Sequence, residues 1–483
     1  MPTQSRFSLH HIIRTLFLTN GALYLFLGLC ISSLALLMPA LINGYPLLNE
    51  DTATYLYSGK EGFLPADRPY YYGLFVRHIS LNFTLWPVIF AQAIAVFFLL
   101  LLFVKKITDF PLIKNIIATT LIIISLALTS SLAVFTSYAM ADLFTGLGFI
   151  ALFMILFFNL SLAEKIFCWI IFLFSLSSHL SNVPTYAIVL FLSFIYSLCR
   201  KLPGKAAQLK KTLLLLVITF FWIPSLNFIF FQRFVLSEAG YVFIAGKMAQ
   251  EGLLQKYLTL RCPNAPQELC SADSIPRSAV FFIWNSNSPA YKSCPYPSKQ
   301  TENEPIYVCF RYKNPIYKKM LGDMLSDPEM GPEMVKTLCY DWMRQLVLYK
   351  SEDQFFDSLP KPIDLGVYGH IKFMFPGDLE RVKASKQFNG AMDFTILNKT
   401  SFFILLASCL AAVLFLFYMP QCRNLYYHLF VFLLANAFVC GCLSDVLNRY
   451  QSRIMWLPPF AAIIILLIFM KEKRENLNHP AEN

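Results

Sequence analysis

The stretch GYPLLNEDTATYLYSGKEGFLPADRPYYYGLFVRH, residues 44–78, lies between two long apolar runs and is too polar to cross a membrane itself. It holds an acidic pair, Glu50 and Asp51, followed by Lys60 and Arg68, with several tyrosines close to these charges. Ionisable side chains directly after a first membrane span are what an enzyme working at the membrane surface needs. A solvated loop that only links two helices is the simpler alternative.

The composition around this stretch predicts an integral membrane protein. Hydrophobic residues make up 57% of the 483 residues and charged residues only 14%, whereas a soluble domain has about a quarter charged residues. The net charge is +11, but the lysines and arginines lie largely at the ends of apolar runs. That placement follows the positive-inside rule, so the lipid bilayer is the expected partner and nucleic acid is not.

Ten apolar runs have roughly the length that a bilayer requires. In lipid the backbone must be helical, so these runs predict an all-α polytopic membrane protein with about ten transmembrane helices and one inserted soluble domain of mixed structure. The expected spans are about 18–42, 83–104, 114–135, 143–163, 166–181, 184–199, 212–232, 402–420, 425–443 and 454–470.

Basic residues cluster in alternate short loops, for example at Lys105-Lys106 and over 200–211. The positive-inside rule therefore places both termini in the cytoplasm and residues 44–78 outside. Three domains follow. Residues 1–232 form a membrane domain with the first seven spans, 233–401 a soluble extracytoplasmic domain, and 402–483 the last three spans with a short cytoplasmic tail.

The outward segment 233–401 contains five cysteines, which favour disulfides in an oxidising compartment. Cys262 and Cys270 bound a short loop, and Cys294 and Cys309 are candidates for a second bridge, although pairing cannot be deduced from sequence alone. A zinc site is the rival interpretation. The segment has no Cys-x-x-Cys pair and a single histidine, so we expect no metal there.

Three further outward clusters are candidates to meet the first loop at one membrane face. They contain Asp142, His179, and the pair Arg449 and Arg453. Each has a structural alternative: Asp142 as a helix-capping acid, His179 as an interfacial histidine, and the arginines as side chains that reach lipid headgroups. If helical, Arg449 and Arg453 lie one turn apart on one face, and two guanidinium groups suit a phosphate or pyrophosphate.

This order of clusters resembles the GT-C superfamily of polytopic membrane glycosyltransferases, which includes the protein mannosyltransferases and the aminoarabinose transferases. Members keep an acidic residue in the first outward loop, here within Asn49-Glu50-Asp51. They often continue with a tyrosine and an Arg-Pro-aromatic stretch, similar to Tyr55 and Arg68-Pro-Tyr-Tyr-Tyr. An Asp at the start of a later span and an Arg-Tyr before a proline-containing last span are similar to Asp142 and Arg449-Tyr450. The resemblance covers the membrane part, and segment 233–401 resembles no family domain with a known role.

The resemblance implies transfer of a sugar from a polyprenyl-phosphate donor to a glycan, lipid or protein acceptor at the outer face of a bacterial cytoplasmic membrane. It implies inversion at the sugar carbon, with Asp51 as the general base and Glu50 as the second candidate. No cofactor is expected, although a divalent metal with Asp142 as a partner is possible. The expected substrate-binding residues are Lys60, Arg68, Tyr55, Tyr70, Asp142, His179, Arg449 and Arg453.

Three other functions remain open from the sequence. An O-antigen-type polymerase or ligase also acts on polyprenyl-linked glycans, but would tend to carry catalytic arginines and a histidine inside its large late loop. A transporter would show matched broken spans or charges in mid-membrane, which this chain lacks. A non-catalytic scaffold would use the outward domain to bind a partner.

Overall fold

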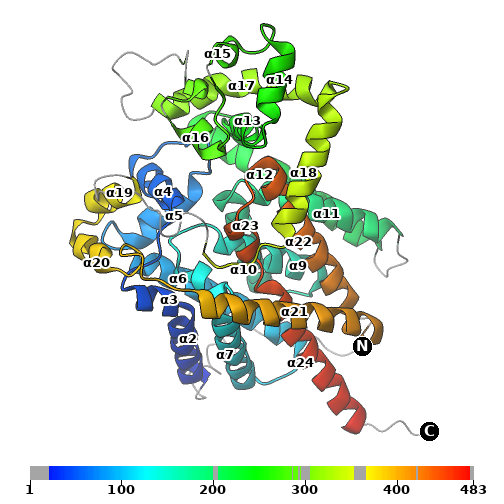
Figure 1. Cartoon of the computed structure of the whole chain (residues 1–483). Helices are drawn as coiled ribbons and strands as arrows, with labels where there is room; N and C mark the ends of the chain where they lie inside the picture. The colour runs from blue at the N-terminus through cyan, green and yellow to red at the C-terminus, as the bar shows by residue number, and fades with distance from the viewer. Residues whose placement is uncertain are drawn as a thin grey trace.

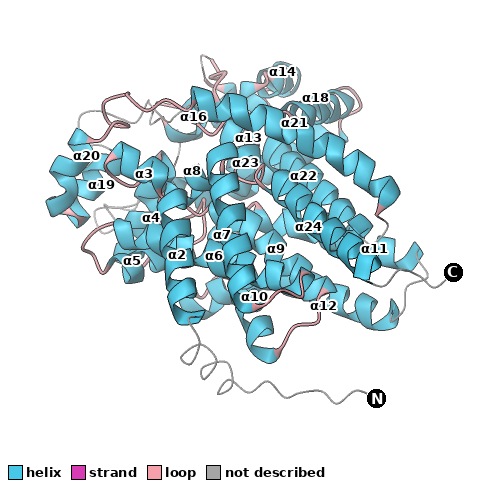
Figure 2. Ribbon diagram, turned by 90° about the horizontal axis from the view of Figure 1, so that it is seen from below, coloured by secondary structure: helices cyan, strands magenta, loops and turns pink. Residues whose placement is uncertain are grey.

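The computed structural model describes residues 21–199, 205–272, 274–285, 287–291, 294, 305–352, 366–419 and 422–478. Within these ranges every regular element is a helix, and a single isolated β-bridge pairs Leu47 with Tyr138 (Figure 2). The expected all-α class is therefore confirmed for the described residues.

Seven helices of the described chain are long and apolar enough to cross a membrane, so the protein is a multi-pass membrane protein. The three remaining expected runs fall on α2 (Gly21–Leu36), α9 (Leu143–Phe157) and α10 (Leu162–Ser178), and the count of ten stays a prediction. The seven helices are α6 (Trp86–Ile107), α7 (Leu112–Thr129), α11 (Asn182–Cys199), α12 (Lys205–Phe231), α21 (Thr395–Tyr418), α22 (Arg423–Leu443) and the run Asn448–Lys473, which joins α23 (Asn448–Ser452) to α24 (Leu457–Asn478).

The first loop folds into two packed helices, α4 (Glu50–Glu61) and α5 (Tyr71–Ser80). Asn49 begins α4 through a capping box with Thr52, which satisfies free backbone N–H groups of the first turn. The helices touch where Gly59 meets Gly73, and a Cβ on Gly59 would lie 2.2 Å from the Gly73 carbonyl oxygen. The first loop is therefore a packed pair of helices rather than an extended linker.

The first part of segment 233–401 forms a helical cap with its own hydrophobic core (Figure 1, top). Disulfides join Cys262 to Cys270 and Cys294 to Cys309 within it. We call this body the cap. Its helices are α13 (Gly240–Gln250), α14 (Leu253–Arg261), α15 (Gln267–Cys270), α16 (Ala279–Trp284), α17 (Pro305–Ser326) and α18 (Met330–Leu346).

The later part of the segment packs elsewhere. Helix α19 (Gly366–Met374) lies beside α4, away from the cap, and α20 (Leu379–Ala384) packs next to α19 (Figure 1). Val367 and Ile371 are buried in the main core together with the membrane helices. The described part of 233–401 is thus helical rather than mixed, and it divides between two cores.

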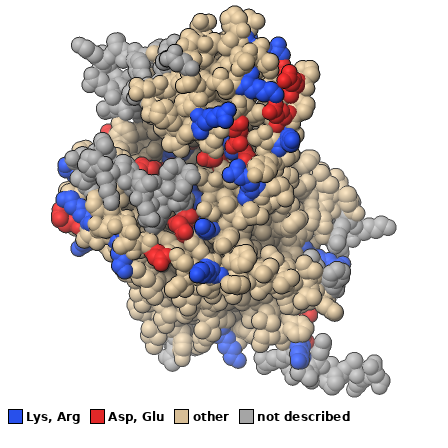
Figure 3. Space-filling view, in the orientation of Figure 1, with Lys and Arg blue, Asp and Glu red and all other residues tan. Residues whose placement is uncertain are grey.

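Charge separates the two ends of the molecule. Figure 3 shows lysine, arginine, aspartate and glutamate gathered on the cap and just below it, while the lower part of this face is mostly uncharged. The helices α2, α7 and α24 extend away from the cap into that lower part (Figure 1). The lower part of this face is therefore the more apolar of the two ends.

Candidate functional site

Backbone pairing brings the first loop to the start of α9. The Leu47 N–H donates to the Ser137 carbonyl at 2.9 Å, and the Ala139 N–H donates to the Leu47 carbonyl at 3.0 Å. The Thr52 hydroxyl, in the first turn of α4, donates to the Ala139 carbonyl. These bonds place the acidic start of α4 next to Asp142, the residue that precedes α9.

Asp51 lies between two arginines from distant parts of the chain. Its Oδ1 is 2.8 Å from Arg68 Nη1, and its Oδ2 is 3.0 Å from Arg449 Nη2. Arg449 Nη1 also donates to Asn49 Oδ1 at 2.9 Å, across 400 residues of sequence. Arg68 forms a second ion pair with its neighbour Asp67 at 2.7 Å. The start of α4 and the start of α23 therefore face each other through charge-assisted contacts.

Arg453 forms the second half of the cluster, and its side chain is fully buried. Its Nη1 is 3.1 Å from Asp142 Oδ1, and its Nη2 donates to Ser181 Oγ at 2.9 Å and to Asn436 Oδ1 at 2.8 Å. A buried guanidinium is costly unless it is paired and hydrogen-bonded, and this one is held by three separate elements.

Tyr450 joins the two halves. The Arg449 and Arg453 guanidinium carbons lie 5.1 and 5.6 Å from the centre of its ring, a distance typical of cation–π contacts. His179 packs edge-on to the same ring at 6.5 Å, and its Nδ1 is 2.8 Å from Ser181 Oγ. The four polar clusters of the sequence thus meet in one continuous network.

The two carboxyls at the start of α4 differ in acidity. Burial raises the pKa of Asp51, but the Arg68 and Arg449 guanidiniums outweigh burial and hold that pKa below its ordinary value. Burial and the adjacent Asp51 charge raise the pKa of Glu50 to about 7. Asp51 is therefore a paired, permanently charged anchor, whereas Glu50 changes protonation near neutral pH.

His179 is a neutral side chain in this setting. Burial, followed by the nearby Arg453 charge, lowers its pKa to about 3. The imidazole can therefore accept or donate one hydrogen bond but adds no positive charge to the network at neutral pH.

Two buried carboxylate oxygens in the network are open acceptors. Asp67 Oδ1 and Asp142 Oδ2 have no hydrogen-bond partner among the described residues. Arg453 Nε is a buried donor that also has no hydrogen-bond partner among the described residues. Buried polar atoms are nearly always satisfied in native proteins, so these three atoms mark the part of the network with hydrogen-bonding capacity left over among the described residues.

Two expected site residues lie outside the network. Lys60 is in the last turn of α4, and its Nζ lies 3.2 Å above the ring of Phe373 in α19. Lys60 lies nine positions after Asp51 in this helix, roughly 13 Å along the axis. Tyr70 packs edge-on against Tyr71 and Phe231. Tyr55 does border the network, because Arg68 lies 5.7 Å from its ring centre.

Asp67 and Asn436 belong to the network but were not expected there from the sequence. Asp67 stands beside Arg68, and this adjacent opposite charge was the available signal. Asn436 lies inside the apolar helix α22, where a lone amide gives no clue to its partner 17 residues later. Among the described residues, no three histidine, cysteine, aspartate or glutamate side chains are grouped to hold a metal ion.

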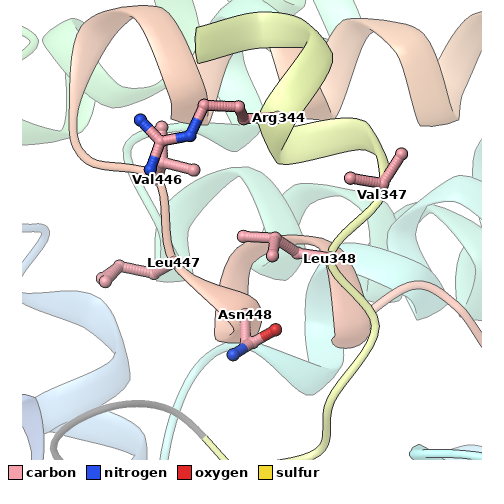
Figure 4. A pocket seen from close by; sticks show the side chains of 6 residues that line it. All are labelled: Arg344, Val347, Leu348, Val446, Leu447 and Asn448. Carbon is pink, nitrogen blue, oxygen red and sulfur yellow. The ribbon is translucent and has the colours of Figure 1, made fainter.

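A hollow of about 250 Å³ lies next to the start of α23 (Figure 4). Arg344 and Asn448 supply its polar lining, and Asn448 directly precedes Arg449. The remaining lining is aliphatic and comes from Val347, Leu348, Val446 and Leu447. The hollow therefore opens beside the charge network and carries an apolar wall.

Comparison of the chain with protein-family models, with curated proteins and with solved structures finds no match.

Proposed function

We propose that the protein is a membrane glycosyltransferase of the GT-C kind that moves a sugar from a polyprenyl-phosphate donor to an acceptor. The observation that carries the proposal is the buried network in which Asp51 faces Arg68 and Arg449, next to the Asp142–Arg453 pair. Carboxyls for proton transfer and guanidiniums for phosphate are the two groups that such a reaction needs.

The arginines suit the leaving group. As the bond between the sugar carbon and the phosphate oxygen breaks, the electron pair goes to the phosphate, which leaves as polyprenyl phosphate. Arg68 and Arg449 lie on the two oxygens of one carboxylate, so they are already placed to hold two oxygens of one anion. Guanidinium groups bind phosphate oxygens bidentately and stay charged, and their effect is largest where water is excluded.

The proton acceptor is better assigned to Glu50 than to Asp51. In the reaction the acceptor hydroxyl forms the new bond to the sugar carbon, and its proton passes to a carboxylate. A base is most effective when its pKa lies near the working pH, and the pKa of Glu50 is about 7. Asp51 is held by two guanidiniums that make it a weaker base. We assign Asp51 the role of positioning Arg68 and Arg449.

The open acceptors support a polyhydroxylated ligand. Asp67 Oδ1 and Asp142 Oδ2 are buried at the network without partners among the described residues. Sugar hydroxyls are donors that would satisfy them. Two of the helices at the network, α22 and the run of α23 and α24, are long and apolar enough to span a membrane, which gives the polyprenyl chain an apolar route to the same place.

The test compares glycan and glycolipid profiles of cells that carry wild type or single variants at matched expression. We expect Glu50→Gln to reduce the product about 10²–10⁴-fold, the range for loss of a general base. Arg68→Ala should also abolish it, and Arg68→Lys should restore it only in part because lysine lacks the fork. Glu61→Gln, the same change at the exposed end of α4, is the matched control and should keep the product.

The same profiles distinguish Glu50 from Asp51 as the general base and test the transferase proposal itself. If Asp51→Asn abolishes the product while Glu50→Gln keeps it, the base is Asp51. If all of the network variants keep the product, the transferase proposal fails, and the scaffold or transporter alternative takes its place.

A further inference from the structure

The C-terminal half of helix α18 buries two polar side chains and exposes large apolar ones. Asp341 and Gln345 are fully buried, whereas Tyr340, Met343 and Val347 are 64%, 59% and 71% exposed. A helix at a water-facing surface normally buries its apolar stripe and exposes its charges. The reversed arrangement is expected where the surroundings of the helix are apolar.

The inward edge is fixed by specific contacts, so the helix cannot simply rotate. Asp341 Oδ2 pairs with Lys247 Nζ of α13 at 2.7 Å, and both side chains are fully buried. The Gln345 amide donates to the Leu447 carbonyl at 2.8 Å and accepts from the Leu447 N–H at 3.0 Å. The outward direction of Met343 and Val347 is therefore built into the fold.

The C-terminal half of α18 runs beside the membrane span α22 (Figure 1). Trp342 Nε1 donates to the Leu434 carbonyl at 3.1 Å, and its ring packs edge-on against Phe438 at 5.6 Å. Leu434 lies nine residues before Leu443, where α22 ends. That distance is roughly 13 Å along the helix, so this part of α18 reaches the depth of the span.

The exposed side chains of α18 differ between its N-terminal and C-terminal ends. At the start of α18, Glu329 and Glu333 form exposed ion pairs with Lys256 of α14. From Cys339 onward the exposed large hydrophobic side chains are Tyr340, Met343 and Val347, with the free thiol of Cys339 exposed among them. Arg344 is the charged side chain exposed on this stretch, and its guanidinium lies over the Tyr340 ring. Tyrosine and tryptophan at this level are typical of membrane–water interfaces.

We propose that the outward face of the C-terminal half of α18 is a lipid-binding surface that rests in the headgroup and upper acyl region of the bilayer. Its occupant is phospholipid, because the face continues the exposed apolar surface of α22, where Phe438 touches Trp342. Amphipathic helices bind lipid in this way by burying an apolar face at the interface. The surface does not depend on the proposed transferase activity.

The hollow at the end of α18 extends this surface inward. Val347 and Leu348 line it at the C-terminal end of α18, and Asn448, the residue before Arg449, lines its other side (Figure 4). An acyl chain that covers Val347 would therefore pass close to the start of α23.

Nitroxide labelling in lipid nanodiscs of phosphatidylcholine and phosphatidylglycerol tests the proposal on the full chain. In a background with Cys30, Cys199 and Cys409 replaced by alanine, the native Cys339 carries one label. With Cys339 also replaced by serine, Met343→Cys and Glu329→Cys carry the others. Power-saturation EPR then compares access of oxygen, which concentrates in lipid, with access of a water-soluble nickel chelate.

We expect labels at 339 and 343 to be at least fivefold more accessible to oxygen than to the nickel chelate, and the label at 329 to show the opposite preference. Labels at 343 and 329 with the same preference for the nickel chelate would overturn the proposal. Exclusion of both reagents at 343, with dipolar broadening between labels, would also overturn it and assign the face to a second copy of the chain. Size-exclusion profiles confirm that each labelled variant is folded.

Discussion

At the residue scale, the network balances three carboxylates against three guanidiniums. Asp51, Asp67 and Asp142 pair with Arg68, Arg449 and Arg453, and each arginine contacts at least one of them. Glu50 is the additional acid, and burial together with the adjacent Asp51 charge raises its pKa. That surplus explains why Glu50, rather than a paired aspartate, changes protonation near neutral pH.

The pKa of Glu50 predicts the pH dependence of activity. A carboxyl is a base only when deprotonated, so product formation should rise with pH up to a plateau, with a midpoint near pH 7. With Glu50→Asp, the residual rate should still rise with pH. With Glu50→Gln, the remaining rate should no longer rise with pH. Initial rates in membranes between pH 5 and 9 measure this. A wild-type rate independent of pH across that range would contradict the role of Glu50.

The same carboxyl affects stability with a defined sign. The folded pKa is raised above the ordinary value of 4.5 to about 7, so between these values the folded state binds more protons than the unfolded state. The contribution of Glu50 is therefore present at low pH and is lost as pH rises towards and through 7. Glu50→Gln should stabilise the protein at pH 8 relative to wild type and change little at pH 4.5, as melting of the purified protein would show.

At the element scale, the Asp142–Arg453 pair fastens the start of α9 to the end of α23. Both side chains are buried, and removing one partner of such a pair costs about 3–5 kcal/mol because the other charge is left uncompensated. Arg453→Met alone should therefore reduce the yield of folded protein. The double variant Arg453→Met with Asp142→Asn should recover the yield but not the product.

Fluorescence-detected size exclusion measures the folded yield for this pair of variants. The control is Lys471→Met, which breaks the ion pair with the exposed Asp109 and should change stability by less than about 1 kcal/mol. A single variant Arg453→Met that folds normally would show that Arg453 does not fasten the two helices. Full activity in the double variant would exclude Arg453 from catalysis.

The helices of this chain were largely predictable and their contacts were not. Apolar length specifies α6, α11 and α22, because a span needs about 20 apolar residues whatever it packs against. Nothing local indicates that Asn49 meets Arg449, since that contact joins residues 400 positions apart. Lys60 and Tyr70 were expected in the site because they are near Asp51 in sequence, but helix length and aromatic packing carry them away from it.

At the scale of the whole molecule, charge distribution predicts which side of the membrane each part occupies. Lys210 and Lys211 lie near the start of α12, and the cap follows its other end. The positive-inside rule places those lysines in the cytoplasm and the cap outside.

Single cysteines at Lys210 and Glu329 test this orientation. In intact cells an impermeant thiol reagent should label position 329 and leave position 210 unlabelled until the membrane is opened. Labelling at 210 in intact cells would reverse the orientation and place the charge network on the cytoplasmic side.

The most direct test of the central proposal is the binding of a long-chain polyprenyl phosphate to the purified protein in nanodiscs. We expect saturable binding to wild type that weakens at least tenfold in Arg449→Ala and only slightly in the distant control Lys60→Ala. Binding should be retained in Glu50→Gln, because Glu50 transfers a proton and does not hold the phosphate. Equal affinity for wild type and Arg449→Ala would contradict the assignment of the network as a phosphate site.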